Sequence, residues 1–388
     1  MSRLDELIQE LCPDGIEYLP IGKTVDYEQP SKYIVESTNY DESYDIPVLT
    51  AGQTFVLGYT NENKGIYEAT NKKPVIIFDD FTGAFKWVDF RFKVKSSAMK
   101  ILTPKSGVAI LRYVYHCMGK LGFSSSEHKR LWIGTYSEFR IPIPPIEVQR
   151  EIVRILDSFT ELSAELSAEL SARKLQYEYY RDMLFDDMEC KCVPIYELAD
   201  TNIGLATSVT KHKRDKGVLL LHNSDIQQNV IILKSVEYVS EEFAKQNWKK
   251  ILQENDIITV HTGDVGTSAV IKGKYVGSIG FTTITTRIKD KKAVLPEYLC
   301  HYLNSQRCKA DIASMTISDR NNLNQSSFEK LNVPIPSIEK QKEIVTILDR
   351  FEQICSDISS GLPAEIEVRQ KQYEHYRDKL LTFTEKRA

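Results

Sequence analysis

The chain of 388 residues contains an internal repeat, and this repeat constrains the fold more than any other feature. The segment 141–157 reads IPIPPIEVQREIVRILD and recurs at 333–349 as VPIPSIEKQKEIVTILD. A second matching pair follows, with QYEYYRDML at 176–184 and QYEHYRDKL at 372–380. A repeat of this kind predicts that one structural unit occurs twice along the chain.

Each copy of the repeat begins with Pro-x-Pro, which cannot lie inside a helix. Behind it, apolar residues recur at steps of three, four and seven, which predicts a helix from about Glu147 to Met183, about 55 Å long at 1.5 Å per residue. A helix of this length needs a partner, and the second copy, from Glu339 to about Phe383, is the obvious one. Ser359–Pro363 predicts a break in that second helix.

The two segments outside the helices, 19–140 and 193–332, have the pattern of globular domains. They contain short β-rich runs, punctuated by Gly and Asn, and some helix. The runs expected to form strands are 74–78, 256–260 and 268–271, and 296–303 is expected to be helical. The predicted fold class is α+β, with two mixed α/β globular domains separated by two long helices in a pseudo-twofold internal repeat.

Composition places the chain in a broad class. It is 42% hydrophobic and 27% charged, which predicts a soluble globular protein. The sequence has no apolar run near the roughly 18 residues that span a bilayer, and its N-terminus lacks a signal-peptide core. Its seven cysteines form no Cys-x-x-Cys pair. We therefore expect reduced thiols in a cytoplasm, which the family resemblance given below would place in a bacterium or archaeon.

Charge is distributed unevenly, although the net charge is only −4. Residues 19–140 carry 16 Lys and Arg against 13 Asp and Glu, and residues 193–332 carry 18 against 15. The helical segment 146–192 carries 6 against 11. Mildly basic globular domains on an acidic helix are compatible with DNA contact by the domains.

The duplicated Pro-x-Pro-x-x-Glu-x-Gln-x-x-Ile-x-x-x-Leu, followed by a helix that ends in Gln-Tyr-Glu-x-Tyr-Arg-Asp, resembles the DNA-specificity (S) subunit of type I restriction-modification systems. The resemblance covers essentially the whole chain. It implies that target-recognition domains 19–145 and 193–337 each read one half of a split DNA site. It also implies that the conserved helices 146–192 and 338–388 form an antiparallel coiled coil, and that the segment 1–18 packs near the C-terminal helix.

The same resemblance implies a chain that has no catalysis of its own and binds no cofactor. Its implied partners are double-stranded DNA, two modification subunits that methylate adenine with S-adenosylmethionine, and restriction subunits that use ATP and Mg; no membrane is involved. Because 19–140 and 193–332 barely match each other, we expect the two half-sites to differ. A coiled-coil scaffold between proteins, without a DNA role, is the alternative.

Catalytic and metal motifs offer little support for an enzyme. The Gly-Lys pairs at 22, 119 and 273 lack the rest of a P-loop, and the Asn/Asp-Pro-Pro-aromatic motif of amino-methyltransferases is absent. Asp79, Asp80, Glu62 and Lys64 could be arranged as a nuclease site, but such pairs are common on surfaces. Cys300, His301 and Cys308 match no usual zinc spacing, so a helix with a buried Cys explains them better.

Three loop-like stretches carry the residue types that read DNA, namely Arg, Lys, Asn and Gln. They are a basic cluster at 211–216, an amide-rich run at 318–325, and 124–130 in the matching place of the first domain. A fourth loop, 262–266, could approach DNA closely through its glycines. An ordinary solvated loop is the alternative for each, and Trp87, Trp132 and Trp248 are assigned to the core. The predicted DNA contacts are Lys211, Lys213, Arg214, Arg320, Asn321, Asn322, Gln325, Ser125, His128, Lys129 and Arg130.

Two further features lie in the helices. The first is the end of each copy, where a partner interface and internal packing are equally compatible with the recurring residues Tyr177, Tyr180, Arg181, Tyr373, Tyr376 and Arg377. The second is the tandem Glu-Leu-Ser-Ala at 161–172. A four-residue period keeps Leu near one face of a helix, but it also suits a length gauge. The predicted gauge residues are Glu161, Leu162, Glu165, Leu166, Glu169 and Leu170.

Deletion of one Glu-Leu-Ser-Ala unit, residues 165–168, tests the gauge. Each unit adds about 6 Å of helix and a net rotation of about 40°. We expect the deletion to shorten the unread spacer of the DNA site while both half-sites keep their sequence. Mapping of the methylated motif measures this, and an altered half-site with an unchanged spacer would contradict the gauge.

Overall fold

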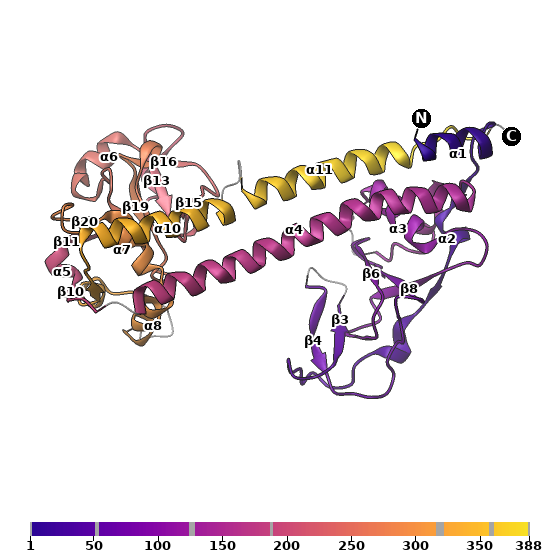
Figure 1. Cartoon of the computed structure of the whole chain (residues 1–388), viewed down its shortest axis with the longest axis horizontal. Helices are drawn as coiled ribbons and strands as arrows, with labels where there is room; N and C mark the ends of the chain where they lie inside the picture. The colour runs from indigo at the N-terminus through magenta and orange to yellow at the C-terminus, as the bar shows by residue number, and fades with distance from the viewer. Residues whose placement is uncertain are drawn as a thin grey trace. The chain divides into compact units, whose positions relative to one another are not determined.

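The computed structural model describes residues 2–50, 54–123, 129–186, 189–315, 322–356 and 361–386 (Figure 1). The chain divides into two compact units. Unit 1 consists of Met1–Leu166 with Ile366–Ala388, and unit 2 is Ser167–Glu365. Each unit therefore holds one globular part together with segments of both helical copies.

The globular part of unit 1 contains two β-sheets and a covering helix. The antiparallel sheet has the order β2–β8–β5–β6, and a smaller sheet has the order β4–β3–β7, in which β3 pairs in parallel with β7. All five residues of β5 are buried, as a continuous apolar run requires of a central strand. The elements are β2 (Val25–Glu28), β3 (Ile46–Leu49), β4 (Val56–Thr60), β5 (Val75–Asp79), β6 (Phe85–Val88), β7 (Lys93–Val94), β8 (Met99–Pro104), α2 (Ile21–Thr24) and α3 (Leu111–Leu121).

The globular part of unit 2 repeats this topology and adds strand β12 and the pair β14–β15. Its antiparallel sheet has the order β11–β20–β17–β18, and its second sheet, β12–β16–β13–β19, again contains a parallel pair, β13 with β19. The predicted strands 74–78, 256–260 and 268–271 and the predicted helix 296–303 are all present. The elements are β11 (Ala199–Ile203), β12 (Lys213–Arg214), β13 (Val218–His222), β14 (Ile226–Gln227), β15 (Val230–Ile231), β16 (Glu237–Val239), β17 (Ile257–Val260), β18 (Ser268–Val270), β19 (Ile279–Phe281), β20 (Thr283–Ile288), α5 (Ile195–Leu198), α6 (Glu241–Gln246), α7 (Pro296–Leu303), α8 (Gln306–Met315) and α9 (Gln325–Phe328).

The first copy of the repeat is one helix, α4 (Ile146–Asp186), as predicted. In the described residues the second copy consists of α10 (Ile338–Ser356) and α11 (Leu362–Leu380). Of the predicted break at Ser359–Pro363, residues 359 and 360 lie outside the described residues. Pro363 is the second residue of α11, a position at which Pro costs no hydrogen bond.

Short extended pairs tie each globular part to its helix. β1 (Tyr18–Pro20) pairs with β9 (Arg140–Pro142), and β10 (Cys192–Pro194) pairs with β21 (Asn332–Pro334). Both Pro-x-Pro elements begin in these strands. Helix α4 or α10 follows immediately, and its first turns are buried against α3 or α7 in the respective core.

A buried glutamine completes this attachment in both units. In unit 1 the side chain of Gln149 accepts a hydrogen bond from the Ile110 backbone N–H at 2.9 Å and donates to the Pro144 carbonyl at 2.8 Å. In unit 2 Gln341 accepts from the Leu295 N–H at 2.9 Å and donates to Pro336 at 3.0 Å. These glutamines hold the start of α3 or α7 against the Pro-x-Pro element of the same unit.

The N-terminal segment belongs to the core of unit 1. Leu4 of α1 (Arg3–Leu11) is buried in the same cluster as Leu381, just beyond α11. Ile16 and Glu385 form a parallel backbone bridge, and the Tyr18 hydroxyl donates to the Phe383 carbonyl at 3.1 Å. The two ends of the chain are thus joined within one unit.

Substitution Gln149→Ala should lower the free energy of unfolding by about 1–3 kcal/mol, because it leaves the buried N–H of Ile110 and the carbonyl of Pro144 without a partner. Chemical denaturation of the full chain measures the change. Arg150→Ala, an exposed change in the same helical turn, is the control and should stay within about 0.5 kcal/mol of the parent. Equal stability of the two variants would contradict the role given to Gln149.

Candidate nucleic-acid interface

In unit 2 the fold brings together two stretches that sequence analysis treated separately. The loop that follows β17 meets the segment that precedes β21. Leu323 donates its N–H to the His261 carbonyl at 2.9 Å, and the Thr262 hydroxyl bonds to the Asn322 side chain at 2.9 Å. The Asn223 amide donates to the Thr262 carbonyl at 2.6 Å. Gly263 and Gly266 take φ values of +101° and +88°, which favour glycine, so the turn of this loop requires them.

A groove beside this loop has the lining that readout of base edges needs. Amides, hydroxyls and lysines line it together with the Asp264 carboxylate; amides and hydroxyls can bond to base edges, and lysines can donate to bases and phosphates. Its lining residues include Asn223, Gln227, Gln228, Lys234, Thr262 and Lys309. Asn322 bonds to Thr262 at its edge, whereas Arg320 and Asn321 lie outside the described residues.

Unit 1 places different chemistry at the equivalent point. After β5, the Asp80 carbonyl accepts from the Leu131 N–H at 2.7 Å, which is the counterpart of the His261–Leu323 bond. The Asp80 carboxylate is buried, accepts from the Trp132 N–H at 2.9 Å and pairs with Lys100 at 3.3 Å. Arg130 lies 3.9 Å from it and is exposed, as is Lys129. Ser125 and His128 lie outside the described residues.

The basic cluster of unit 2 lies at the edge strand β12. Lys213 pairs with Glu237 of the neighbouring strand β16 at 2.5 Å, and this hydrogen bond lowers the pKa of Glu237. The Arg214 guanidinium donates to the Lys213 and Lys211 carbonyls at 2.7 and 3.1 Å. All three basic side chains are exposed, which leaves their remaining N–H groups available to phosphates.

Several predicted residues have other surroundings than expected. The Gln325 amide donates to Thr201 and to Glu329 at 2.8 and 2.9 Å, so its N–H groups are engaged inside unit 2. Trp132 is buried, but Trp248 is 67% exposed, so its assignment to the core was wrong. It begins a one-turn helix, Trp248–Lys250, in which the Lys249 ammonium lies over the indole, 5.6 Å from the ring centroid. An exposed Trp among lysines is a contact candidate that sequence analysis missed.

The carboxylates that could have suggested a nuclease have structural roles. Glu62 pairs with the buried Lys93 at 2.6 Å and accepts two backbone N–H bonds, and these contacts lower its pKa against the opposing effect of burial. Asp79 accepts the Phe81 N–H at 2.8 Å. Each acid is therefore already occupied within the fold.

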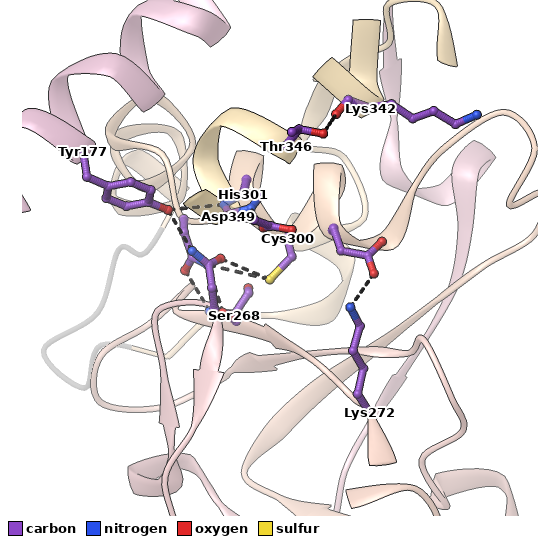
Figure 2. Close-up of polar contacts among 11 residues, drawn as sticks. Tyr177, Ser268, Lys272, Cys300, His301, Lys342, Thr346 and Asp349 are labelled. Carbon is purple, nitrogen blue, oxygen red and sulfur yellow. Dashed lines mark hydrogen bonds and ion pairs between the residues drawn. The ribbon is translucent and has the colours of Figure 1, made fainter. Parts of the chain in front are cut away.

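A polar cluster in unit 2 joins three helices. Figure 2 shows the Tyr177 side chain pointing toward His301 and Asp349, with Cys300 beside them. The Tyr177 hydroxyl lies 3.2 Å from His301 Nδ1, and Nε2 lies 2.8 Å from the Asp349 carboxylate. Cys300 is buried and its thiol contacts Asn229 at 3.4 Å. Among the described residues, it is His301, Asp349 and Glu352, not the cysteines, whose ligand atoms approach one another, to within 4.8 Å.

Comparison with known proteins fits this geometry. The family described as "Type I restriction modification DNA specificity domain" matches residues 15–173 and 189–368. The chain belongs to this family. The EcoR124I/EcoR124II specificity subunit of Escherichia coli is 40% identical over 407 residues, which cover 99% of this chain and 97% of that protein. A putative type I specificity subunit of Haemophilus influenzae is 29% identical and covers 95% of this chain and 96% of its own length.

Solved structures share the fold of this specificity-family chain. The S subunit of a type I restriction-modification system from M. genitalium covers 95% of this chain and 96% of its own, with a TM-score of 0.57 and 13% identity. A chain from a structure of type I restriction-modification complex assembly covers 95% and 98%, with a TM-score of 0.58 and 15% identity. Among the described helices, none has the length and apolarity to cross a membrane.

The recurring residues at the ends of the helical copies all have internal contacts in this family member. Tyr180 stacks on Phe351 at 5.6 Å and Tyr376 on Phe159 at 5.2 Å, a symmetric pair of contacts. Arg181 is only 1% exposed. Arg181 pairs with Asp182 and lies over the ring of Tyr177. In the second copy Arg377 pairs with Asp378 and lies over the ring of Tyr373. Their role in a partner interface stays a prediction.

Helix α4 also carries a more exposed apolar face, which includes Tyr179, the residue before Tyr180. Leu175 and Tyr179 are 68% and 66% exposed and lie one turn apart. Sequence analysis missed them because they fall outside the main apolar stripe. At the same positions of the second copy stand Lys371 and His375, which are exposed but polar.

The tandem at 161–172 lies inside the unbroken helix α4. The leucines face the packed side, with Leu166 buried and Leu162 and Leu170 half-buried, while Glu161, Glu165 and Glu169 are exposed. This arrangement suits both the helical-packing and the length-gauge hypotheses, so the gauge stays a prediction.

Glu352 provides a test of the polar cluster in unit 2. Burial raises its pKa to about 8, and the neighbouring Asp349 carboxylate adds to the rise. Between an unfolded pKa of about 4.3 and this folded value, the folded chain holds a proton that the unfolded chain has lost, so the contribution of Glu352 to stability falls as pH rises.

Glu352→Gln should therefore stabilise the chain more at pH 8 than at pH 5. Thermal denaturation at both pH values measures the two differences. Glu343→Gln, an exposed change on α10, serves as the control. If the gain from Glu352→Gln were the same at both pH values, the side chain would be ionised in the fold and the assigned environment would be wrong.

Proposed function

We propose that the chain is the non-catalytic DNA-specificity subunit of a type I restriction-modification complex. In this proposal the globular parts of units 1 and 2 are target-recognition domains. Each one reads half of an asymmetric, bipartite DNA site, and the bases between the halves are not read. The mechanism is geometric, because the chain supplies recognition and spacing while its partners supply the chemistry.

One observation carries this proposal: the same fold occurs twice with unlike side chains at the equivalent reading position. Unit 2 offers Thr262, Asn322 and an amide-lined groove, whereas unit 1 offers Arg130 and Lys129 beside a buried Asp80. Amides bind adenine edges well and guanidinium groups bind guanine, so unlike sets favour unlike half-sites. A scaffold without a DNA role would have no reason to keep such sets at matching positions.

The partners follow from membership of the family and from exposed apolar surface. The face with Leu175 and Tyr179 is a candidate docking surface for a modification subunit, since apolar side chains this exposed commonly mark protein contacts. Two modification subunits would bring S-adenosylmethionine and adenine-N6 methylation, and restriction subunits would bring ATP and Mg. No cofactor is proposed for this chain.

A genome-wide map of N6-methyladenine, with and without this gene, tests the proposal. We expect one split motif with two unlike halves to lose its methylation when the gene is deleted, and to regain it on complementation. Deletion of a modification subunit's gene is the matched control and should erase the same motif. If no split motif depends on this gene, the specificity role is wrong.

DNA binding by the assembled complex separates this function from the scaffold alternative. Affinity should fall steeply with salt, because phosphate contacts release counterions, and should depend on the methylated motif. A scaffold without a DNA role would show neither a dependence of affinity on the methylated motif nor a steep fall of DNA affinity with salt.

A further inference from the structure

The Tyr177–His301–Asp349 cluster of unit 2 has a counterpart in unit 1. There the Tyr373 hydroxyl lies 3.0 Å from His116 Nδ1, and His116 Nε2 lies 2.8 Å from the Asp157 carboxylate. The same atoms meet in unit 2 at 3.2 and 2.8 Å. Asp157 and Asp349 are equivalent in the sequence repeat, as are Tyr177 and Tyr373. The histidines lie outside the repeat, in globular parts whose sequences barely match.

The chemistry of these groups gives each chain of bonds a direction. A carboxylate only accepts, so His Nε2 must carry the hydrogen, and the other nitrogen of a neutral ring must then accept from the Tyr hydroxyl. Burial lowers the pKa of His116, which favours this neutral form. The same two contacts, Tyr–His and His–Asp, occur in both units, and both histidines are buried.

Each bond chain connects three elements of its unit. The His comes from the domain helix, α3 or α7. The Asp comes from the helix that directly follows the same domain, α4 or α10. The Tyr comes from the opposite copy of the repeat, α11 in unit 1 and α4 in unit 2. A rotation of the domain helix would break bonds to both long helices at once.

The surroundings of the two clusters differ, although the bond chains do not. In unit 1 the Arg112 guanidinium pairs with Asp157 at 2.8 Å. In unit 2 the Asn229 amide donates to the Tyr177 hydroxyl at 2.8 Å, and Glu352 stands where the first copy has Thr160. A metal would account for the acids of unit 2 only, whereas a hydrogen-bonded joint accounts for both units.

We propose that Tyr177–His301–Asp349 and Tyr373–His116–Asp157 are positioning residues that fix the angle of each target-recognition domain against its two helices. They would restrict the spacer lengths that the complex accepts, without touching DNA. This inference rests on the proposed specificity function and deepens it. Hydrogen bonds suit this task because they depend on direction, whereas apolar contacts tolerate rotation.

The test uses Tyr177→Phe and Tyr373→Phe in the assembled complex, each of which removes one hydroxyl and keeps the ring. Tyr27→Phe in unit 1 and Tyr196→Phe in unit 2 are the controls, since both tyrosines are exposed and lie outside the clusters and the predicted partner interface. Methylation rates are measured on DNA with the mapped half-sites and the native spacer, and with spacers one base pair shorter or longer. Thermal midpoints are measured in parallel.

We expect the preference for the native spacer to fall about fivefold in Tyr177→Phe and in Tyr373→Phe, the effect of one net hydrogen bond. The controls should keep the parent preference, and the half-site sequences should stay the same in all variants. A lowered thermal midpoint with an unchanged spacer preference would show a merely structural role and overturn the inference. Failure of the proposed function would differ, because the parent complex would then methylate no split motif.

Discussion

In each unit one buried glutamine joins the start of the domain helix to the Pro-x-Pro element, beside the strand pairs β1–β9 and β10–β21. The prolines of Pro-x-Pro donate no backbone hydrogen bond, so the chain that enters α4 or α10 is held through its backbone by the middle residue, Ile143 or Ile335, and by the strand before it. Gln149 and Gln341 add side-chain bonds, because each carboxamide accepts the N–H of the residue that caps the domain helix and donates back to the Pro-x-Pro carbonyl. This contact holds the start of α3 or α7, the helix that carries the histidine.

The two units share the attachment but carry different side chains in the loops after β5 and β17. The loops after β5 and β17 close on the following segment through one backbone bond in both units, Asp80 to Leu131 and His261 to Leu323. A backbone bond constrains the path of the chain but not its side chains. The two units can therefore carry a buried, lysine-paired Asp80 at one site and a Thr262–Asn322 pair at the other on the same fold.

Much of the fold could be predicted from the sequence because periodicity and repetition are local signals. The long helix α4, strands β5 and β17 and helix α7 are all marked by apolar spacing. The duplicated sheet topology could not be predicted, since the domains share pairing geometry but few side chains. The repeat made Tyr177 and Tyr373 visible, but their partners His301 and His116 are single residues in unmatched segments. Trp248 was misassigned because a large aromatic residue is buried in most contexts, and only the tertiary fold exposes it.

The buried Tyr–His–Asp chains are hard to explain by stability alone. Each hydrogen bond contributes only about 1 kcal/mol net, because the cost of burying the polar groups offsets most of its strength, so packed apolar side chains of the same volume would stabilise the contact as well. What an apolar contact lacks is direction. The same Tyr–His–Asp contacts occur in both units, while the neighbours of the clusters, such as Arg112 and Asn229, differ. Selection for an angle, rather than for binding energy, accounts for that combination of constancy and change.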